Sequence, residues 1–141
     1  MPLATAGCRS AVPLAAPAPA PEVAAGCGKL VAAAPAKVLN RGRRETEPNS
    51  PLTAAWGDPP ITLVCGVAPP AGLATAQSQC FEVNGVGWYA ENAQNGVVFT
   101  TIGRRIYVEV AVPDDYAPEA NVLTDLSDAI SRHDPLVTPC L

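Results

Sequence analysis

The sequence predicts an α+β domain: an antiparallel, meandering sheet of about four to five strands with two helices packed on one face, stapled by disulfides. Three observations predict it. Short runs rich in β-branched residues follow one another with turn signals between them, an Ala-rich helical pattern precedes them, and an amphipathic helical pattern follows them. The length of 141 residues fits one domain. The longest uncharged stretch carries four prolines, so it does not read as a membrane-spanning helix.

Residues 1–25 are predicted to form a flexible tether, and residues 26–141 the single domain. Residues 10–21 repeat Ala and Pro without apolar periodicity, which is typical of an extended, polyproline-like spacer. Small residues lead into Cys8, as at the processing site of a bacterial lipoprotein, although Thr5 stands where leucine is usual and no signal-peptide pattern precedes it. We therefore consider three states of Cys8: a lipid anchor, a free thiol, or a partner in an intermolecular disulfide.

The first helix is predicted from Gly26, with Pro35 shortening it. Its apolar residues recur at helical spacing: Cys27, Leu30, Val31, Ala34 and Val38. A turn-rich connection follows and contains the basic cluster of residues 41–44. We expect this cluster to be a solvated loop, and its alternative is a contact with a phosphate or a lipid headgroup. The first strand is expected at residues 61–65, which are rich in β-branched side chains.

Further strands are expected where Asn-Gly turn signals separate apolar runs, over residues 79–83, 86–90, 97–102 and 105–112. The last of these runs alternates apolar and polar residues most regularly. A closing amphipathic helix follows Pro118 and ends at Asp134-Pro135. Its apolar stripe consists of Val122, Leu123, Leu126, Ala129 and Ile130.

The cysteines of the domain favour disulfides. No CxxC or HxxxH spacing occurs, which argues against zinc ligation and against a thioredoxin-like redox motif. Disulfides persist in oxidising compartments outside the cytoplasm, so we expect an exported protein. Four cysteines allow three pairings. The preferred one joins Cys27 to Cys65, clamping the first helix to the first strand, and Cys80 to Cys140; the other two stay open.

The remaining residues carry no recognisable catalytic pattern. Residues 1–44 have a net charge of +5 and residues 45–141 one of −9, and this acidic body argues against nucleic-acid binding. His133, the single histidine, lies beside serines and Asp134 at a helix end, where a Ser-His-Asp triad would not converge. The pair Asp114-Asp115 reads as a strand-terminating turn. No catalytic residue, metal ligand or cofactor is therefore predicted.

Two tryptophans are the candidate binding residues. Trp56 and Trp88 stand in Gly-rich contexts, where tryptophan serves as an anchor or ligand platform, and the alternative is that both are core bulk. With Asp58 and Arg104 they form the candidate binding surface. We expect a monomeric, non-enzymatic cell-envelope protein, with an N-terminal membrane tether as one option, that binds another envelope protein or a cell-wall component. The alternative is a small-ligand-binding or hydrolytic envelope protein with a pocket near these four residues.

Four stretches of the chain resemble an actinobacterial family of unknown function, the domain-of-unknown-function family numbered 3515. They are residues 55–66, which include the unusual string Trp-Gly-Asp-Pro-Pro, and residues 83–88, 98–104 and 107–113. The resemblance implies a small exported or membrane-anchored envelope protein, without an assigned activity. It also implies that Cys27 and Cys65 are the shared pair, and Cys80 with Cys140 follows by elimination.

Overall fold

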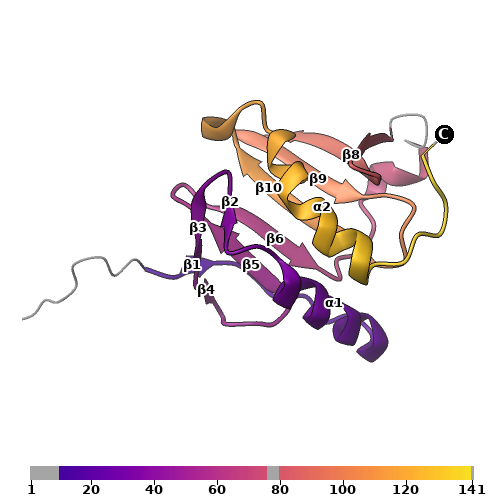
Figure 1. The fold of residues 1–141 in the computed structure, drawn as a ribbon, viewed down its shortest axis with the longest axis horizontal. Coiled ribbons are helices and arrows are strands. Elements are labelled where there is room, and N and C mark those ends of the chain that lie inside the picture. The colour runs from indigo at the N-terminus through magenta and orange to yellow at the C-terminus, as the bar shows by residue number, and fades with distance from the viewer. Residues whose placement is uncertain (1–9, 76–79, 141) are drawn as a thin grey trace, which may run out of the picture.

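Two layers make up the structure, a computed structural model that describes residues 10–75 and 80–140: one broad sheet and two helices on one of its faces (Figure 1). The helices are α1 (Pro21–Ala33) and α2 (Asn121–His133). The sheet contains the strands β2 (Lys37–Val38), β3 (Arg41–Arg44), β5 (Thr53–Trp56), β6 (Ile61–Cys65), β7 (Phe81–Val83), β8 (Val86–Ala93), β9 (Gly96–Thr101) and β10 (Val108–Pro113). Two 3₁₀ helices are η2 (Ala71–Thr75) and η4 (Asp114–Tyr116).

The sheet consists of two antiparallel meanders that meet in its middle. Its spatial order is β2-β3-β5-β6-β10-β9-β8-β7, so the four earlier strands form one half and the four later strands the other. The halves join where β6 pairs with β10, with Leu63 opposite Val110. Helix α1 precedes the first meander and α2 follows the second, and the two helices contact each other over this seam.

The core lies between the sheet and the helices. Strand alternation puts Ile61, Leu63 and Cys65 of β6 on the helix-facing side, and all three are buried. The strand β10 does the same with its valines, and α2 buries the apolar stripe that its periodicity predicts: Val108, Val110, Val112, Val122, Leu123, Leu126, Ala129 and Ile130. Burial of this apolar surface is the main source of stability.

The α+β class and the two covering helices are confirmed, whereas the expected size of the sheet is wrong. The eight strands of the described sheet exceed the predicted four to five because β2, β3 and β5 were not expected. Two of these strands have two and four residues, with the sequences KV and RGRR, too short and too polar to show alternation. The basic cluster of residues 41–44 is thus a strand, not a loop, and pairs with β5.

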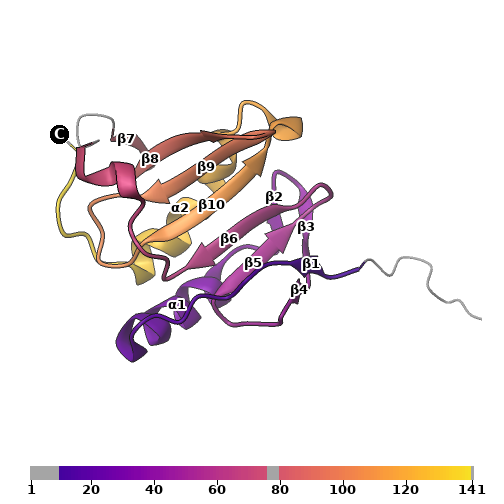
Figure 2. The ribbon, with the colours of Figure 1, turned by 180° about the vertical axis from the view of Figure 1, so that it is seen from behind.

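The segment before α1 packs on the opposite face of the sheet (Figure 2). Its strand β1 (Val12–Pro13) pairs in parallel with β4 (Thr46–Glu47), and Val12 is only 4% exposed. Pro19 lies against Gly66 at the end of β6. Within the segment expected as a tether, residues 1–25, the structure thus contains the short strand β1 and the start of α1, and Cys8 lies outside the described residues.

Helix α1 begins five residues before its predicted start. Pro21 occupies the first turn, where its missing N–H costs no hydrogen bond and its fixed φ suits the helix. Glu22 follows, near the positive end of the helix dipole. The Ala/Pro pattern that reads as a spacer therefore contains a helix start, which explains the misplaced boundary.

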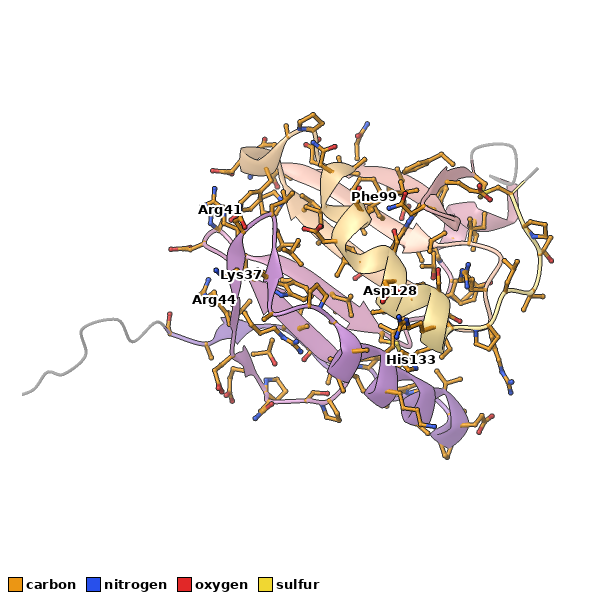
Figure 3. The ribbon with its side chains drawn as sticks, viewed as in Figure 1. Lys37, Arg41, Arg44, Phe99, Asp128 and His133 are labelled. Carbon is orange, nitrogen blue, oxygen red and sulfur yellow. A yellow bond between two sulfur atoms is a disulfide. The ribbon has the colours of Figure 1, made fainter. Side chains whose placement is uncertain are left out.

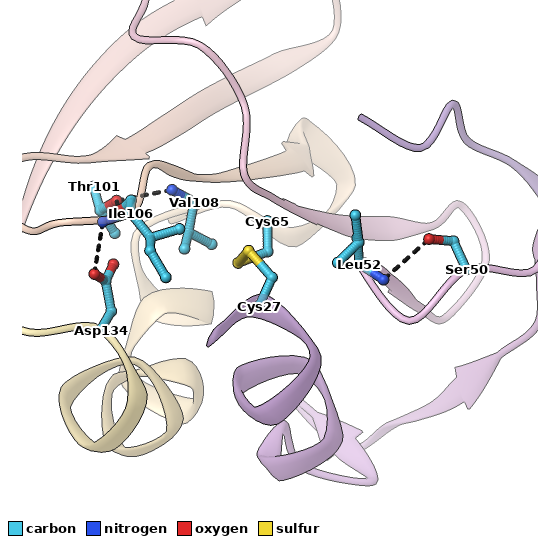
Figure 4. Close-up of a disulfide and its surroundings, with 8 residues drawn as sticks. All are labelled: Cys27, Ser50, Leu52, Cys65, Thr101, Ile106, Val108 and Asp134. Atoms are coloured by element: carbon cyan, nitrogen blue, oxygen red, sulfur yellow. Dashed lines mark hydrogen bonds between the residues drawn. A yellow bond between two sulfur atoms is a disulfide. The ribbon is translucent and has the colours of Figure 1, made fainter. Parts of the chain in front are cut away.

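Both preferred disulfides are present. Cys27–Cys65 joins α1 to β6 with its Cα atoms 5.5 Å apart, and both cysteines are fully buried (Figure 4). Cys80–Cys140 fastens the C-terminal tail next to β7, with Cα atoms 5.7 Å apart. Gly87 of β8 lies under this second disulfide: a Cβ there would come within 2.7 Å of the Cys140 sulfur. This position therefore requires glycine for packing.

Candidate binding groove

Both tryptophans of the predicted binding surface are core residues. Trp56 ends β5 with no exposed surface, and its indole Nε1 donates a hydrogen bond to the Pro35 carbonyl at 2.9 Å. The guanidinium of Arg43 lies over its ring, 5.5 Å from the centroid. Trp88 in β8 is equally buried and packs edge-on against Phe99, with ring centroids 6.4 Å apart. Neither ring is available as a ligand platform in this conformation.

The other two predicted residues lie in different halves of the sheet. Asp58 stands in the turn between β5 and β6, its side chain 71% exposed and 3.9 Å from the Arg44 guanidinium. Arg104 lies between β9 and β10, where Nη1 donates to the Asp134 carbonyl at 2.7 Å and Nη2 to the Gly85 carbonyl at 3.1 Å. The structure therefore does not bring these four residues to one surface.

Arg104 does, however, line a groove that sequence reasoning missed. The groove has a volume of about 720 Å³ and its lining is mainly apolar. It lies between the loop after β6, the β9–β10 connection and the C-terminal tail. Its lining residues are Pro69, Pro70, Leu73, Cys80, Ile102, Gly103, Arg104, Arg105, Tyr107, Val137, Thr138, Pro139 and Cys140. No sequence pattern could reveal it, because its three walls are distant in the chain.

Backbone hydrogen bonds fix the walls of the groove. Gly103, which has a φ of +81°, accepts from the amides of Val137 and Thr138 at 2.7 and 2.9 Å. Arg105 donates its amide to the Pro135 carbonyl at 2.9 Å. On the other side of the groove, the Tyr107 carbonyl accepts hydrogen bonds from the backbone amides of Gly66 and Val67, at 2.9 and 3.2 Å. The tail is further held by the Cys80–Cys140 disulfide. The groove is therefore preformed.

The buried carboxylate of Asp134 joins the β9–β10 connection to the end of α2. Asp134 follows α2 with no exposed surface, and its Oδ1 accepts from the Ile106 amide at 2.8 Å (Figure 4). Its Oδ2 has no hydrogen-bond partner among the described residues. Thr101 adds two bonds, donating to the Ile106 carbonyl at 3.1 Å and accepting from the Val108 amide at 2.9 Å. Hydrogen bonds thus link the β9–β10 connection to the end of α2.

Burial makes this carboxylate a pH-dependent element. It raises the pKa of Asp134 to about 6, against the lowering effects of the Ile106 amide and the Arg104 charge. A folded-state pKa above the unfolded value means that the folded protein binds the proton more tightly. The stability that Asp134 contributes is therefore complete below about pH 4 and is lost as the pH rises through about 6.

We expect Asp134→Asn to remove this pH dependence, since the amide oxygen can still accept from Ile106 and carries no charge. The free energy of unfolding of the variant, relative to the unaltered protein, should rise by about 2–3 kcal/mol between pH 4 and pH 7. Urea titrations at both pH values measure it. The pKa of Glu109 is also raised, first by burial and then by the charge of Glu91. Because Glu109 is present in both the variant and the unaltered protein, its contribution cancels in the difference between their free energies of unfolding.

Asp128→Asn is the matched control, because this carboxylate lies on the same helix with its side chain 78% exposed. It should leave the dependence on pH unchanged. A parallel pH profile for Asp134→Asn and the unaltered protein would show that the buried carboxyl is not perturbed.

The groove offers binding groups more than catalytic ones. Its described lining contains a tyrosine hydroxyl, a threonine hydroxyl and two guanidinium groups, but no carboxylate or histidine. Arg105 is exposed, and its guanidinium has no hydrogen-bond or ion-pair partner among the described residues. Across residues 10–75 and 80–140, no group of three His, Cys, Asp or Glu side chains is placed to hold a metal ion. The arrangement can receive an apolar group next to a negative charge.

The remaining sequence expectations concern residues away from the groove. His133 is the last residue of α2, and Asp114 and Asp115 form η4 directly after β10, as the expected turn requires. In the described part of the chain, neither helix has the length and apolar character to span a bilayer. The two disulfides indicate an oxidising compartment outside the cytoplasm.

Comparison with known proteins identifies the family. A search of curated proteins and a search of solved structures found no match. The family model described as "Protein of unknown function (DUF3515)" matches residues 4–138. This match includes the segment before α1, the two meanders and the tail as far as Thr138. The chain therefore belongs to the DUF3515 family, as the four stretches of its sequence suggested.

Proposed function

We propose that the protein is a non-enzymatic, exported cell-envelope module whose groove binds an apolar segment of another envelope protein. The observation that carries the proposal is the preformed groove. Its volume of about 720 Å³ lies within the usual range for ligand sites, and its lining is dominated by proline, aliphatic side chains and a disulfide. Such surfaces bind by burying apolar area, with few polar groups that fix orientation.

The polar groups of the groove define the chemistry of the partner. Arg105 presents an unpaired cation at its edge, so a bound segment gains most if it carries a carboxylate there. Val137 is 68% exposed beside it and adds apolar surface that the isolated domain leaves in water. We therefore infer a partner segment that combines apolar side chains with one negative charge.

Site-specific photo-crosslinking in the native cells tests the proposal. A photoreactive residue at Val137, on the rim of the groove, should give one discrete adduct with an envelope protein. The same residue at Asp128, exposed on the outer side of α2, should not. Arg105→Glu should remove the adduct by repelling the partner's carboxylate, whereas Arg132→Glu, the matched charge reversal on α2, should preserve it.

Three outcomes would contradict the proposal: equal adducts from both positions, an adduct that survives Arg105→Glu, or no adduct at all. Release of a small product from cell-wall material by the purified protein would instead support the hydrolytic alternative. Circular dichroism of each variant confirms that it is folded before the result is interpreted.

A further inference from the structure

The positive charges of the chain gather in one region of the fold. Between Glu22 and Glu45 the sequence contains five basic residues and no acidic one. They lie on α1 and on β2 and β3, the two strands at one end of the sheet: Lys29, Lys37, Arg41, Arg43 and Arg44. Residues 45–141 have a net charge of −9 and include the opposite half of the sheet and α2. The molecule is thus electrically polarised from one sheet edge to the other.

Three of these cations form what we call the basic edge: Lys37, Arg41 and Arg43, all exposed on the outermost hairpin of the sheet. Arg41 lies over the ring of Tyr116 at 5.5 Å, and Arg43 lies over Trp56 at the same distance. These contacts hold the two arginines in place without neutralising them. Figure 3 shows Lys37 and Arg41 on this outermost hairpin, and Arg43 follows on β3, where its Nη2 also donates to the Val31 carbonyl at 3.5 Å.

Two carboxylates near the basic edge are engaged by groups other than its three cations. Asp125 of α2 accepts from the Leu39 backbone amide at 2.8 Å, and Asp58 lies 3.9 Å from Arg44. In the described part of the chain, neither Lys37 nor Arg41 has an ion-pair partner, and the same is true of Arg43. The charges of Lys37 and Arg41 are therefore directed at solvent, or at an external anion, and Arg43 adds to them although burial lowers its pKa.

The N-terminal segment enters the domain next to this edge. Arg44, the last residue of β3, donates from Nη2 to the Ser10 carbonyl at 2.8 Å, and β1 then pairs with β4 directly after β3. Both ribbon views place the first described residues on the same side as β2 and β3. Any anchor attached through residues 1–9 would hold the basic edge close to the surface that carries the anchor.

We propose that the basic edge is a docking surface for an anionic lipid bilayer. A basic residue near such a surface raises the membrane partition coefficient about fivefold, so three of them give weak binding that a nearby tether makes effective. The acidic opposite half is repelled by the same surface and turns away from it. Docked in this way, the domain would have a fixed orientation. The basic edge is distinct from the groove, and the inference does not depend on the proposed function.

Vesicle co-sedimentation of the full chain at low ionic strength tests the inference. The protein should bind vesicles of phosphatidylcholine and phosphatidylglycerol in equal parts, fail to bind pure phosphatidylcholine, and dissociate at high salt. Lys37→Glu and Arg41→Glu should each lower the partition coefficient about 25-fold, because each removes one positive charge and adds one negative charge. Arg132→Glu, with the same charge change on α2, should alter it less than about twofold.

The variants are chosen so that folding does not decide the result. Arg41 packs on Tyr116, but no side-chain partner of Lys37 is described, so Lys37→Glu should remain folded even if Arg41→Glu does not. Equal decreases of the partition coefficient for Lys37→Glu and Arg132→Glu would overturn the inference, because the net charge of the protein alone would then determine vesicle binding. Absence of binding to the anionic vesicles would also overturn it. So would saturable binding of inorganic phosphate without vesicle binding, or concentration-dependent self-association that Lys37→Glu abolishes.

Discussion

Trp88→Ala is expected to lower the free energy of unfolding by about 3–5 kcal/mol, the range measured for truncation of a buried tryptophan. The side chain is fully buried under α2 and contacts the ring of Phe99. Because the structure around a deleted core side chain relaxes only partly, most of the cavity stays unfilled. Trp56→Ala should lower the free energy of unfolding by a similar amount, because Trp56 is equally buried on the other side of the core. Equilibrium urea denaturation measures both losses.

The phenylalanine variants separate packing from hydrogen bonding. Trp56 Nε1 donates to the Pro35 carbonyl at 2.9 Å, whereas Trp88 Nε1 has no partner among the described residues. Trp56→Phe therefore leaves a carbonyl unsatisfied, which costs about 1–3 kcal/mol beyond the lost volume, and Trp88→Phe does not. Trp56→Phe should be the more destabilising of the two. The reverse order would show that the indole of Trp56 is not held as described.

Removing the Cys27–Cys65 disulfide should have an effect of similar size. The bond closes a loop of 38 residues, for which the chain-entropy model gives about 4 kcal/mol. Both sulfurs are fully buried between α1 and β6, so Cys27→Ala/Cys65→Ala also leaves a void. The total approaches the whole stability of an ordinary domain, about 5–15 kcal/mol. We expect the double variant to unfold at a much lower urea concentration.

The second disulfide is the matched comparison. Cys80–Cys140 closes a longer loop of 60 residues, but the entropic contribution grows only logarithmically, by a few tenths of a kcal/mol. Its cysteines are only half-buried, so the packing contribution is smaller. Burial should therefore outweigh loop length, and Cys80→Ala/Cys140→Ala should be the milder change. Equal losses would mean that chain entropy alone determines the effect.

The sequence predicts the later half of the fold better than the earlier half. In the later half, Asn-Gly turns delimit β8 and β9, whereas in the earlier half only β6, with its β-branched run, has the bounds that its composition indicates. The hairpin of β2 and β3 is short and polar and is held in the sheet by pairing with β5, and RGRR has no apolar alternation to reveal it. The Ala/Pro stretch likewise becomes ordered through pairing with β4 and packing on β6, which are tertiary effects.

The candidate site was harder to predict than the fold. The glycines around both tryptophans favour a binding platform, yet those glycines serve close packing: Gly57 lies against Tyr116, and Gly87 lies under a disulfide. The groove depends on Asp134, which has no motif around it and matters only because its carboxylate meets the Ile106 amide. Of the four predicted binding residues, only Arg104 lines the groove.

Crosslinking from position 137 tests most directly whether the groove is a binding site. We expect one discrete envelope-protein adduct that disappears with Arg105→Glu, persists with Arg132→Glu, and is not formed from position 128. Adducts of equal yield from positions 137 and 128, or an adduct indifferent to the charge at position 105, would contradict it.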